Sequence, residues 1–308
     1  MKNCFFTIIL TISSLTFVYG GANSDLALVN SQEYKQDQIH SIKVKYNSGR
    51  VNIFRSDDDS IIVREYMNHN DSDFFAQISN VNGNLTIEEG NRPLKAVINL
   101  RRRIEIFIPI VENLSVTTSS GSIAANDKIT ASYVNLESSS GSITINKIEA
   151  NRVTLKTASG SIRGDEITGD AAIVSSSGSI AFGAINGNTQ ANSSSGSMDL
   201  GLVSGDIKAK TFSGSFRSAV TENAGDIAIS SSSGSVTLKI PKGLNFDYSS
   251  RSSSGRLSTP FSDRLFSPIS DKNLVQGVIG DGEIPLDQKH RNVNITTSSG
   301  SINIHWAD

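Results

Sequence analysis

A short phrase recurs along most of this chain of 308 residues: Ser-Gly-Ser followed by an apolar residue. A near-copy, Ser254-Gly255-Arg256-Leu257, precedes its last occurrence. The phrase has its glycines at Gly121, Gly141, Gly160, Gly178, Gly196, Gly214, Gly234 and Gly300. From Gly121 to Gly255 the spacings are 20, 19, 18, 18, 18, 20 and 21 residues. A period of this length that tolerates small insertions is typical of a solenoid, in which each repeat is one coil stacked on the previous one. The pattern predicts an all-β fold, a single-domain parallel β-helix.

Each repeat contains two short strands and two corners. Leu136 and Ser138 share one parity and are expected to face inward, because side chains alternate along a strand. Gly141 then turns the chain, which we attribute to its tolerance of positive φ, and Ile143 continues the inward set. Stacked about 4.8 Å apart, such strands bury one narrow core. The low aromatic content of 6% agrees with a core of this width.

The serine before each corner glycine is expected to form a ladder of hydroxyl groups along the stack. These serines are Ser140, Ser159, Ser177, Ser195, Ser213 and Ser233. A catalytic serine would need a histidine nearby, but all the histidines lie outside the regular repeats. They are His40, His69, His290 and His305. The serines are therefore interpreted as structural.

The second corner of each coil pairs a glycine with an acid or an amide, which is common in turns. The pairs are Gly169-Asp170, Gly187-Asn188, Gly205-Asp206 and Gly225-Asp226. Asp170, Asp206 and Asp226 would lie in one row, and carboxylates one coil apart suit a hard cation. A turn role is favoured. The alternatives are a Ca²⁺ site at these three residues and a pair of catalytic carboxylates, and no other cofactor is indicated.

The two ends of the chain differ from its middle. Residues 1–22 resemble a signal peptide, with Lys2 before an apolar run and small residues at a cleavage site after Ala22. We expect a flexible segment over residues 23–37 and one solenoid domain over 38–308. Within it, irregular early strands precede regular coils of about 19 residues over 114–257, a loop insertion over 258–292 and a closing coil over 293–308. Trp306 is expected to cover the last coil.

Charge and cysteine content restrict the partners and the compartment. With 28 basic and 30 acidic residues the chain has no broad field to attract nucleic acid. Arg101–Arg103 is interpreted as the solvated start of a strand rather than an anion or glycan contact, and Asp57–Asp59 as a turn. Cys4 is the only cysteine, so an exported chain would hold together without disulfides, which favours a bacterial protein. Nothing after the signal peptide predicts a membrane span.

Several of these phrases together resemble a bacterial family. The matching phrases are Ile106-Phe107-Ile108-Pro109, the run from Leu114 to Ile123, the later Ser-Gly-Ser-Ile coils, Leu238-Lys239-Ile240-Pro241, and the close from Ile295 to Ile302. They resemble the putative-adhesin family of extracytoplasmic β-solenoids, also called toastrack domains, over residues 38–308. The resemblance implies a secreted or cell-envelope location and no known chemistry, and it supplies no catalytic or binding residues.

Three classes of function remain open at this point. The first is a non-enzymatic envelope or surface protein, an adhesin or binding scaffold, that presents a repetitive face to a glycan or a protein. The second is a polysaccharide-active enzyme, because parallel β-helices also carry such activities and these need converging carboxylates. The third is a structural or envelope-stress element without a ligand.

Overall fold

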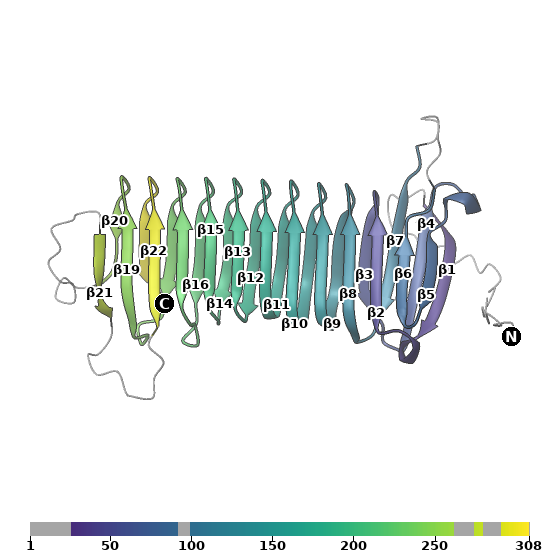
Figure 1. The fold of residues 1–308 in the computed structure, drawn as a ribbon, viewed down its shortest axis with the longest axis horizontal. Coiled ribbons are helices and arrows are strands. Elements are labelled where there is room, and N and C mark those ends of the chain that lie inside the picture. The colour runs from purple at the N-terminus through teal and green to yellow at the C-terminus, as the bar shows by residue number, and fades with distance from the viewer. Residues whose placement is uncertain (1–25, 92–98, 262–273, 280–290, 308) are drawn as a thin grey trace.

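The computed structural model describes residues 26–91, 99–261, 274–279 and 291–307. The expected signal peptide, His290 and most of the expected loop insertion lie outside these ranges. The described residues form one elongated β-solenoid, with a regular stack of coils between two irregular ends (Figure 1). No helix within the described ranges has the length and apolar character needed to cross a membrane.

The described residues contain 23 strands and two short 3₁₀ helices. The helices are η1 (Gln36–Gln38) and η2 (Ser72–Phe74). The strands up to the first regular coils are β1 (Ala27–Lys35), β2 (Ser41–Tyr46), β3 (Arg50–Arg55), β4 (Ser60–Met67), β5 (Gln77–Val81), β6 (Asn84–Glu88), β7 (Arg102–Ile108) and β8 (Val111–Thr118). The middle strands are β9 (Ser122–Ser138), β10 (Ile143–Thr157), β11 (Ile162–Ser175), β12 (Ile180–Asn186), β13 (Thr189–Ser193), β14 (Met198–Val203), β15 (Ile207–Thr211) and β16 (Phe216–Val220). The last are β17 (Ile227–Ser231), β18 (Val236–Ile240), β19 (Phe246–Ser252), β20 (Leu257–Ser258), β21 (Leu274–Ile279), β22 (Asn292–Thr297) and β23 (Ile302–Trp306).

The strands form two faces that enclose the core, and the long strands β9, β10 and β11 run through both. The first face follows the Ser-Gly-Ser corner and contains, in spatial order, β1, β4, β7, β3, β9, β10, β11, β12, β14, β16, β18, β23 and β20. The second face precedes that corner and contains β5, β6, β2, β8, β9, β10, β11, β13, β15, β17, β22, β19 and β21. Pairing between regular coils is parallel throughout. The parallel β-helix expected from the repeats is therefore confirmed.

The register brings equivalent apolar side chains into columns inside the stack. One column on the first face contains Ile123, Ile143, Ile162, Ile180, Met198, Phe216, Val236 and Ile302, each at most 1% exposed. Because the side-chain period of a strand is two, a slip of one residue would turn this whole set outward. The core thus locks the register of every coil to the next.

The N-terminal end is closed by antiparallel strands. Strand β1 pairs with β4, which pairs with β7, and β5 pairs with β6. The flexible segment expected over residues 23–37 is wrong for Ala27–Lys35, because this strand has an ordered partner in β4. Its side chains are mostly exposed or half-buried, so the sequence lacked the inward apolar set that marks the other strands. Antiparallel pairing at a terminus interrupts the parallel edge of the stack.

The C-terminal end departs from the order of the sequence. The last segment, β22 and β23, does not close the stack: β22 lies between β17 and β19, and β23 lies between β18 and β20. In Figure 1 the yellow strand β22 accordingly stands beside β19, with β21 further out. The closing coil expected at the end of the stack is thus its penultimate coil. Part of the expected loop insertion, β21, is a strand antiparallel to β19.

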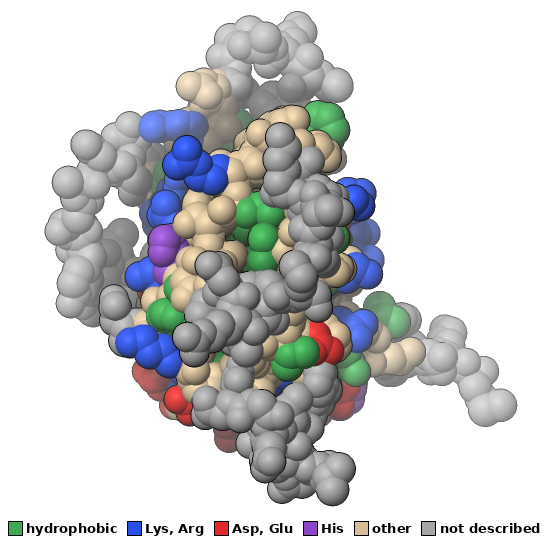
Figure 2. Space-filling model, turned by 90° about the vertical axis from the view of Figure 1, so that its left-hand side faces the viewer, with side chains coloured by type: hydrophobic (Ala, Val, Ile, Leu, Met, Phe, Trp, Pro, Cys, Tyr) green, Lys and Arg blue, Asp and Glu red, His purple; other side chains and the backbone are tan. Residues whose placement is uncertain are grey.

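Trp306 has a different role from the one expected. Its ring meets Phe261 edge-on at 5.2 Å, and Phe261 also contacts Phe246 and Tyr248. Trp306 therefore belongs to an aromatic cluster beside the final coil, rather than covering the end alone. Seen from this end, hydrophobic side chains lie toward the middle of the described surface, and Lys and Arg side chains lie on either side of them (Figure 2).

Candidate functional site

The corner glycines stack directly on one another because no side chain fits between successive coils. A Cβ atom built on Gly141, Gly160 or Gly178 would lie 1.8–2.0 Å from the carbonyl oxygen of the glycine one coil before. The same close approach continues through Gly196, Gly214, Gly234 and Gly300, and Gly121 follows Gly49 in the same way. Positive φ, our explanation for Gly141, is wrong there, although it holds for Gly169 at the second corner, where φ is +126°. The first corner needs glycine for space.

A column of buried hydroxyl groups accompanies these glycines, three residues before each of them. Its members are Thr118, Ser138, Thr157, Ser175, Ser193, Thr211, Ser231, Thr297 and Ser252, all at most 7% exposed. The hydrogen bonds of this column are not uniform: Ser193 and Ser231 donate within their own corners, and the hydroxyls of Ser175 and Thr211 have no partner among the described residues. At Ser138 the hydroxyl donates to the carbonyl of Gly121 at 3.0 Å and accepts from the N–H of Gly141 at 2.8 Å. One hydroxyl therefore ties two successive corners together.

The prediction of a hydroxyl ladder at the serine directly before each glycine is thus wrong, because the buried hydroxyls lie three residues before the glycine. Ser140 and its equivalents are exposed at the tips of the corners, and their backbone N–H groups bond to the preceding coil, as from Ser140 to the carbonyl of Ser119 at 2.9 Å. The signal for the buried column was present in the sequence. Ser138 has the parity of the inward residue Leu136, and a Ser or Thr stands at that position in every coil.

The acids and amides at the second corner form a ladder of their own. Asp170 accepts a hydrogen bond through Oδ1 from the N–H of Asn188 (3.2 Å), and Asn188 does the same for Asp206 (3.0 Å). In the same way, Asp206 Oδ1 accepts from the N–H of Asp226 (2.9 Å), and Asp226 Oδ1 accepts from the N–H of Asn292 (2.9 Å). Each side chain therefore satisfies a backbone donor of the next coil where the chain turns. An amide and a carboxylate serve equally, since both present the same acceptor oxygen.

This ladder accounts for Asp170, Asp206 and Asp226 without a cation. Asp170 and Asp206 are separated by Asn188, so only Asp206 and Asp226 are adjacent carboxylates. Within the described residues, no group of three or more His, Cys, Asp or Glu is arranged to hold a metal ion. Calcium binding at these residues stays a prediction, and their observed contacts are those of turn residues.

A shallow groove crosses the outside of the first face over β9, β10, β11, β12 and β14. It has a volume of about 620 Å³ and is open to solvent. Its polar lining comes from Asn126, Thr144, Asn146, Arg163, Asp165 and Asp199. It lies where each coil bends within its first strand segment, which appears as a register shift between Ile145 and Lys147. Thr144 and Asn146 keep the outward parity of their strand and alternation fails only after them, at Lys147, so period two predicts the side on which they lie but not the groove that they form.

The groove presents donors and acceptors side by side. The amide of Asn146 donates to Asp165 at 3.3 Å, and Asp199 accepts from the N–H of Gly201 at 3.2 Å and pairs with Arg217 at 3.6 Å. Its floor is apolar at Phe182, whose ring occupies the space that a side chain at Gly164 would need. Planar amide, carboxylate and guanidinium groups over an apolar floor suit a hydroxyl-rich or peptide ligand.

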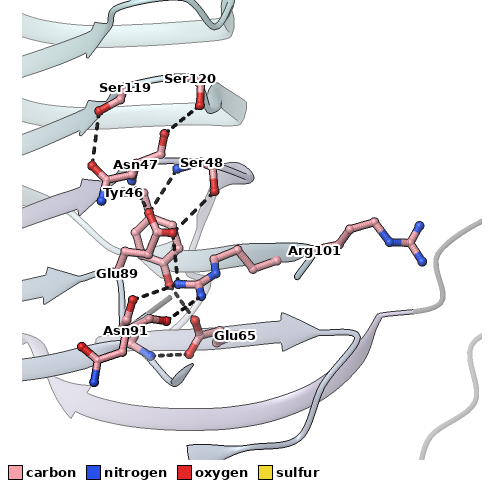
Figure 3. A network of polar contacts seen from close by, with 12 residues as sticks. Tyr46, Asn47, Ser48, Glu65, Glu89, Asn91, Arg101, Ser119 and Ser120 are labelled. Atoms are coloured by element: carbon pink, nitrogen blue, oxygen red, sulfur yellow. Dashed lines mark hydrogen bonds and ion pairs between the residues drawn. The ribbon is translucent and has the colours of Figure 1, made fainter. Parts of the chain in front are cut away.

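A buried polar network lies at the N-terminal end and was missed by the sequence analysis (Figure 3). Glu65 of β4 is 1% exposed and accepts hydrogen bonds from the Tyr46 hydroxyl at 2.9 Å and the N–H of Ala76 at 2.7 Å. Arg102 of β7 pairs with Glu89 at 3.2 Å, with both side chains at most 2% exposed. Glu89 also accepts from the N–H groups of Asn47 and Ser48 at the first corner, as Figure 3 shows.

This network joins the antiparallel cap to the first coil. Tyr46 is in register with Thr118, so it occupies the start of the buried hydroxyl column. Burial raises the pKa of the Glu65 carboxyl, and the hydrogen bonds and Arg102 oppose that shift only in part. Burial also raises the pKa of the Tyr46 hydroxyl, with Glu65 adding to the effect. Tyr46, Glu65 and Arg102 are at most 4% exposed and bond to other groups of the network, so they act here as structural links.

The two charge clusters singled out in the sequence have different outcomes. Asp57–Asp59 forms the exposed turn between β3 and β4, as expected. The interpretation of Arg101–Arg103 as solvated is wrong in part. Arg102 is buried against Glu89, and Arg103 pairs with Glu105 at 3.1 Å and stacks on Tyr66 at 4.4 Å. Arg102 shares the inward parity of Ile104 in β7, so its side chain points into the cap.

Several solved structures resemble this chain distantly. The solved structures that resemble this chain include a putative adhesin from Bacteroides fragilis (16% identity, 68% of this chain and 96% of that chain covered, TM-score 0.47). They also include a putative adhesin from Parabacteroides distasonis (16% identity, 68% and 96% covered, TM-score 0.46). A third is a putative lipid binding protein from the same organism (17% identity, 89% and 96% covered, TM-score 0.42). None of the curated proteins matches the sequence.

Family membership rests on the sequence match rather than on these structures. The sequence pattern of the family described as Toastrack DUF4097 matches residues 39–305, nearly the whole solenoid and both of its irregular ends. The stacked coils, the corner glycines and strands β4 to β7 of the antiparallel cap lie within the matched range, and β1 precedes it. The chain therefore belongs to the Toastrack DUF4097 family.

Proposed function

We propose that this chain is a non-enzymatic binding protein of the bacterial envelope or cell surface, and that it holds a glycan or a protein against the first face of its solenoid. The apolar run after Lys2 supports export. The observation that carries the proposal is the groove over β9 to β14, because it is the place where polar side chains of successive coils converge on an apolar floor.

The regular stack supports a ligand that itself repeats. Asn146 and Asp165 occupy equivalent bends of neighbouring coils, about 4.8 Å apart, and Thr144 and Arg163 are in register beside them. A polymer with a repeated pattern of hydroxyl or amide groups would meet similar partners at each step. Affinity would then be distributed over several coils rather than resting on one residue.

An enzymatic role has less support from the same groove. A catalytic acid is usually held in apolar surroundings that keep it protonated. Asp165 is exposed, and Asp199 is half-buried and already paired with Arg217. No histidine or cysteine lines the groove. The alternative of a polysaccharide-active enzyme is therefore tested in the binding experiment, where cleavage of a bound glycan would support it.

The experiment is a solid-phase binding screen of the purified chain against bacterial wall fractions and host and bacterial glycans, with and without Ca²⁺. The bound glycans are then examined for cleavage. Retention on one class of ligand without cleavage is the expected result. Cleavage would contradict the non-enzymatic assignment, and no retention on any fraction would favour a structural or envelope-stress role.

Two matched variants locate the surface. The double variant Asn146→Ala, Asp165→Ala removes polar groups from the groove, whereas Gln190→Ala, Asn192→Ala removes outward-facing polar groups from the second face. We expect the first to weaken retention and the second to leave it unchanged. Equal effects of the two variants would contradict a site in the groove.

A further inference from the structure

The C-terminal coil, defined as β22, its Ser-Gly-Ser corner and β23, is inserted into the stack out of sequence order. Residues 227–240 form the coil on one side of it, and residues 246–258 form the coil on the other. The chain therefore passes from one neighbour directly to the next and leaves a gap one coil wide. The C-terminal coil, which comes more than 30 residues later in the sequence, fills that gap.

Backbone hydrogen bonds attach the C-terminal coil to both of its neighbours. On one side the N–H of Ser299 donates to the carbonyl oxygen of Ser232 at 2.9 Å. The N–H of Val236 donates in return to the carbonyl oxygen of Ser301 at 2.8 Å. On the other side the N–H of Ile302 donates to the carbonyl of Arg256 at 2.9 Å. These contacts repeat the pattern between regular coils, so nothing in them depends on which chain supplies the coil.

Burial shows what the gap would expose if it were empty. Val293, Ile295, Ile302 and Ile304 of the C-terminal coil are at most 2% exposed. Without them, both neighbouring coils would present open parallel edges and their apolar core residues to solvent. Open strand edges are templates for pairing with another chain. Both edges also belong to earlier parts of the chain, so during synthesis the gap is complete before its occupant emerges.

We propose that the gap between residues 227–240 and 246–258 is an exchange site, and that its partner is a second copy of this chain. Each copy inserts residues 292–306 into the gap of the other. Reciprocal insertion satisfies both gaps and closes a two-fold dimer, the usual outcome of exchanging an identical element. The contacts in the exchanged dimer are those of the single chain, since the register with Ser230 and Arg251 on either side of Thr296 is unchanged.

The test uses full chains with Cys4→Ser and one engineered cysteine each. Ser230 of β17 and Thr296 of β22 are register partners, about 4.8 Å apart, a Cα separation that a disulfide can bridge. Chains with Ser230→Cys and chains with Thr296→Cys are mixed, unfolded in urea, refolded together at high concentration and oxidised. The control mixture contains Lys210→Cys and Ser230→Cys, which are also register partners but lie on coils that follow each other in the sequence.

We expect the first mixture to shift to a disulfide-linked heterodimer on a non-reducing gel and the control mixture to remain monomeric. The double variant Ser230→Cys, Thr296→Cys, refolded alone at low concentration, should form the same disulfide within one chain. Equal heterodimer yields from the two mixtures would overturn the proposal. Failure of the double variant to form its internal disulfide would also overturn it, because the C-terminal coil would then not occupy the gap.

Discussion

Gly178 has no room for a side chain. Its position is fixed by the carbonyl oxygen of Gly160, which a Cβ atom at Gly178 would approach to 1.8 Å, and Gly196 in turn stacks on Gly178. Neither contact involves a flexible side chain that could move aside. Gly243 offers the opposite case, because a Cβ atom there would meet nothing within 4 Å.

We predict that Gly178→Ala lowers the free energy of unfolding strongly. Forcing an atom into a packed site typically costs about 1–3 kcal/mol, and the contact here is with backbone, so the upper part of that range is expected. Gly243→Ala should change the stability little. Urea unfolding of both variants measures the difference, and similar midpoints for the two would contradict the close approach.

The buried hydroxyl of Ser138 leads to a second prediction at this scale. Ser138→Ala leaves the carbonyl of Gly121 and the N–H of Gly141 without their hydroxyl partner, which should cost about 1–3 kcal/mol. Ser140→Ala removes an exposed hydroxyl from the tip of the same corner and should be nearly neutral. Thermal and urea unfolding compare the two. If Ser140→Ala were more destabilising than Ser138→Ala, the hydroxyl ladder expected at Ser140 would be supported instead.

Asp206 distinguishes a turn role from a calcium site. Asp206→Asn keeps the acceptor oxygen for the N–H of Asp226, whereas Asp206→Ala removes it. We predict that the Asn variant unfolds like the wild type and that the Ala variant loses about 1 kcal/mol. Adding Ca²⁺ should leave all three melting temperatures unchanged. A Ca²⁺-dependent rise in the wild type that Asp206→Asn abolishes would show the cation site instead.

Among the elements, the antiparallel cap depends on one buried polar network. Strands β4 and β7 bring Glu65 and Arg102 beside Tyr46 of β2 and Glu89 after β6. A buried carboxyl with hydrogen-bond donors on both oxygens is held in place, and a network of this kind orients the strands that carry it. The cap is therefore attached to the first coil by specific polar contacts as well as by apolar packing.

The raised pKa of Glu65 predicts a pH dependence. Well below the ordinary carboxyl pKa the group is neutral in the folded and unfolded chains, and its contribution to stability is complete. As the pH rises, the unfolded chain releases the proton first, so this contribution is lost once the pH passes the native pKa. The stability of the wild type minus that of Glu65→Gln should therefore fall as the pH rises above the ordinary carboxyl pKa of about 4.

Glu88 is the control for this measurement. Its hydrogen bond to Lys45 lowers the pKa of its carboxyl, so its contribution is present above the ordinary carboxyl pKa and lost as the pH falls. The same subtraction for Glu88→Gln should have the opposite slope, and a small one, because the pair is exposed. Slopes of the same sign for Glu65 and Glu88 would contradict the burial of Glu65 as the cause.

For the whole molecule, the stack distributes both stability and binding surface over many coils. Each regular coil contacts only the coils before and after it, so stability is approximately a sum over coils and interfaces. Deleting residues 160–195 removes two coils and joins Ser159 to Gly196, which keeps both kinds of corner in phase. The remaining coils still have their columns of glycine, hydroxyl and apolar side chains.

We predict that this deletion leaves the chain folded and weakens ligand retention gradually, because part of the groove over β11 to β12 is removed while β9, β10 and β14 remain. Circular dichroism checks the fold, and the solid-phase assay measures retention. Complete loss of retention with an intact fold would indicate one indispensable site rather than a distributed surface.

The repeats in the sequence determined the fold class, the inward residues and the corners. The spacing of the glycines and the parity of Leu136 and Ile143 suffice for this, because each coil is a local unit and its neighbours repeat it. The groove could not be foreseen in the same way. Alternation places Asn146 and Asp165 on the outside of the stack, but only the register of neighbouring strands brings them together.

Only the tertiary structure decided the order of the last coils and the partners in the cap. The C-terminal coil has the same phrase as every other coil, so its sequence fits any place in the stack, and the gap left before β19 selects one. Glu65 likewise gains its hydrogen bonds from Tyr46 of β2 and the N–H of Ala76, and Arg102 of β7 pairs with Glu89 after β6, contacts that form only when the strands of the cap assemble. The repeat determines how one coil packs on another, and long-range strand pairing determines which two coils become neighbours.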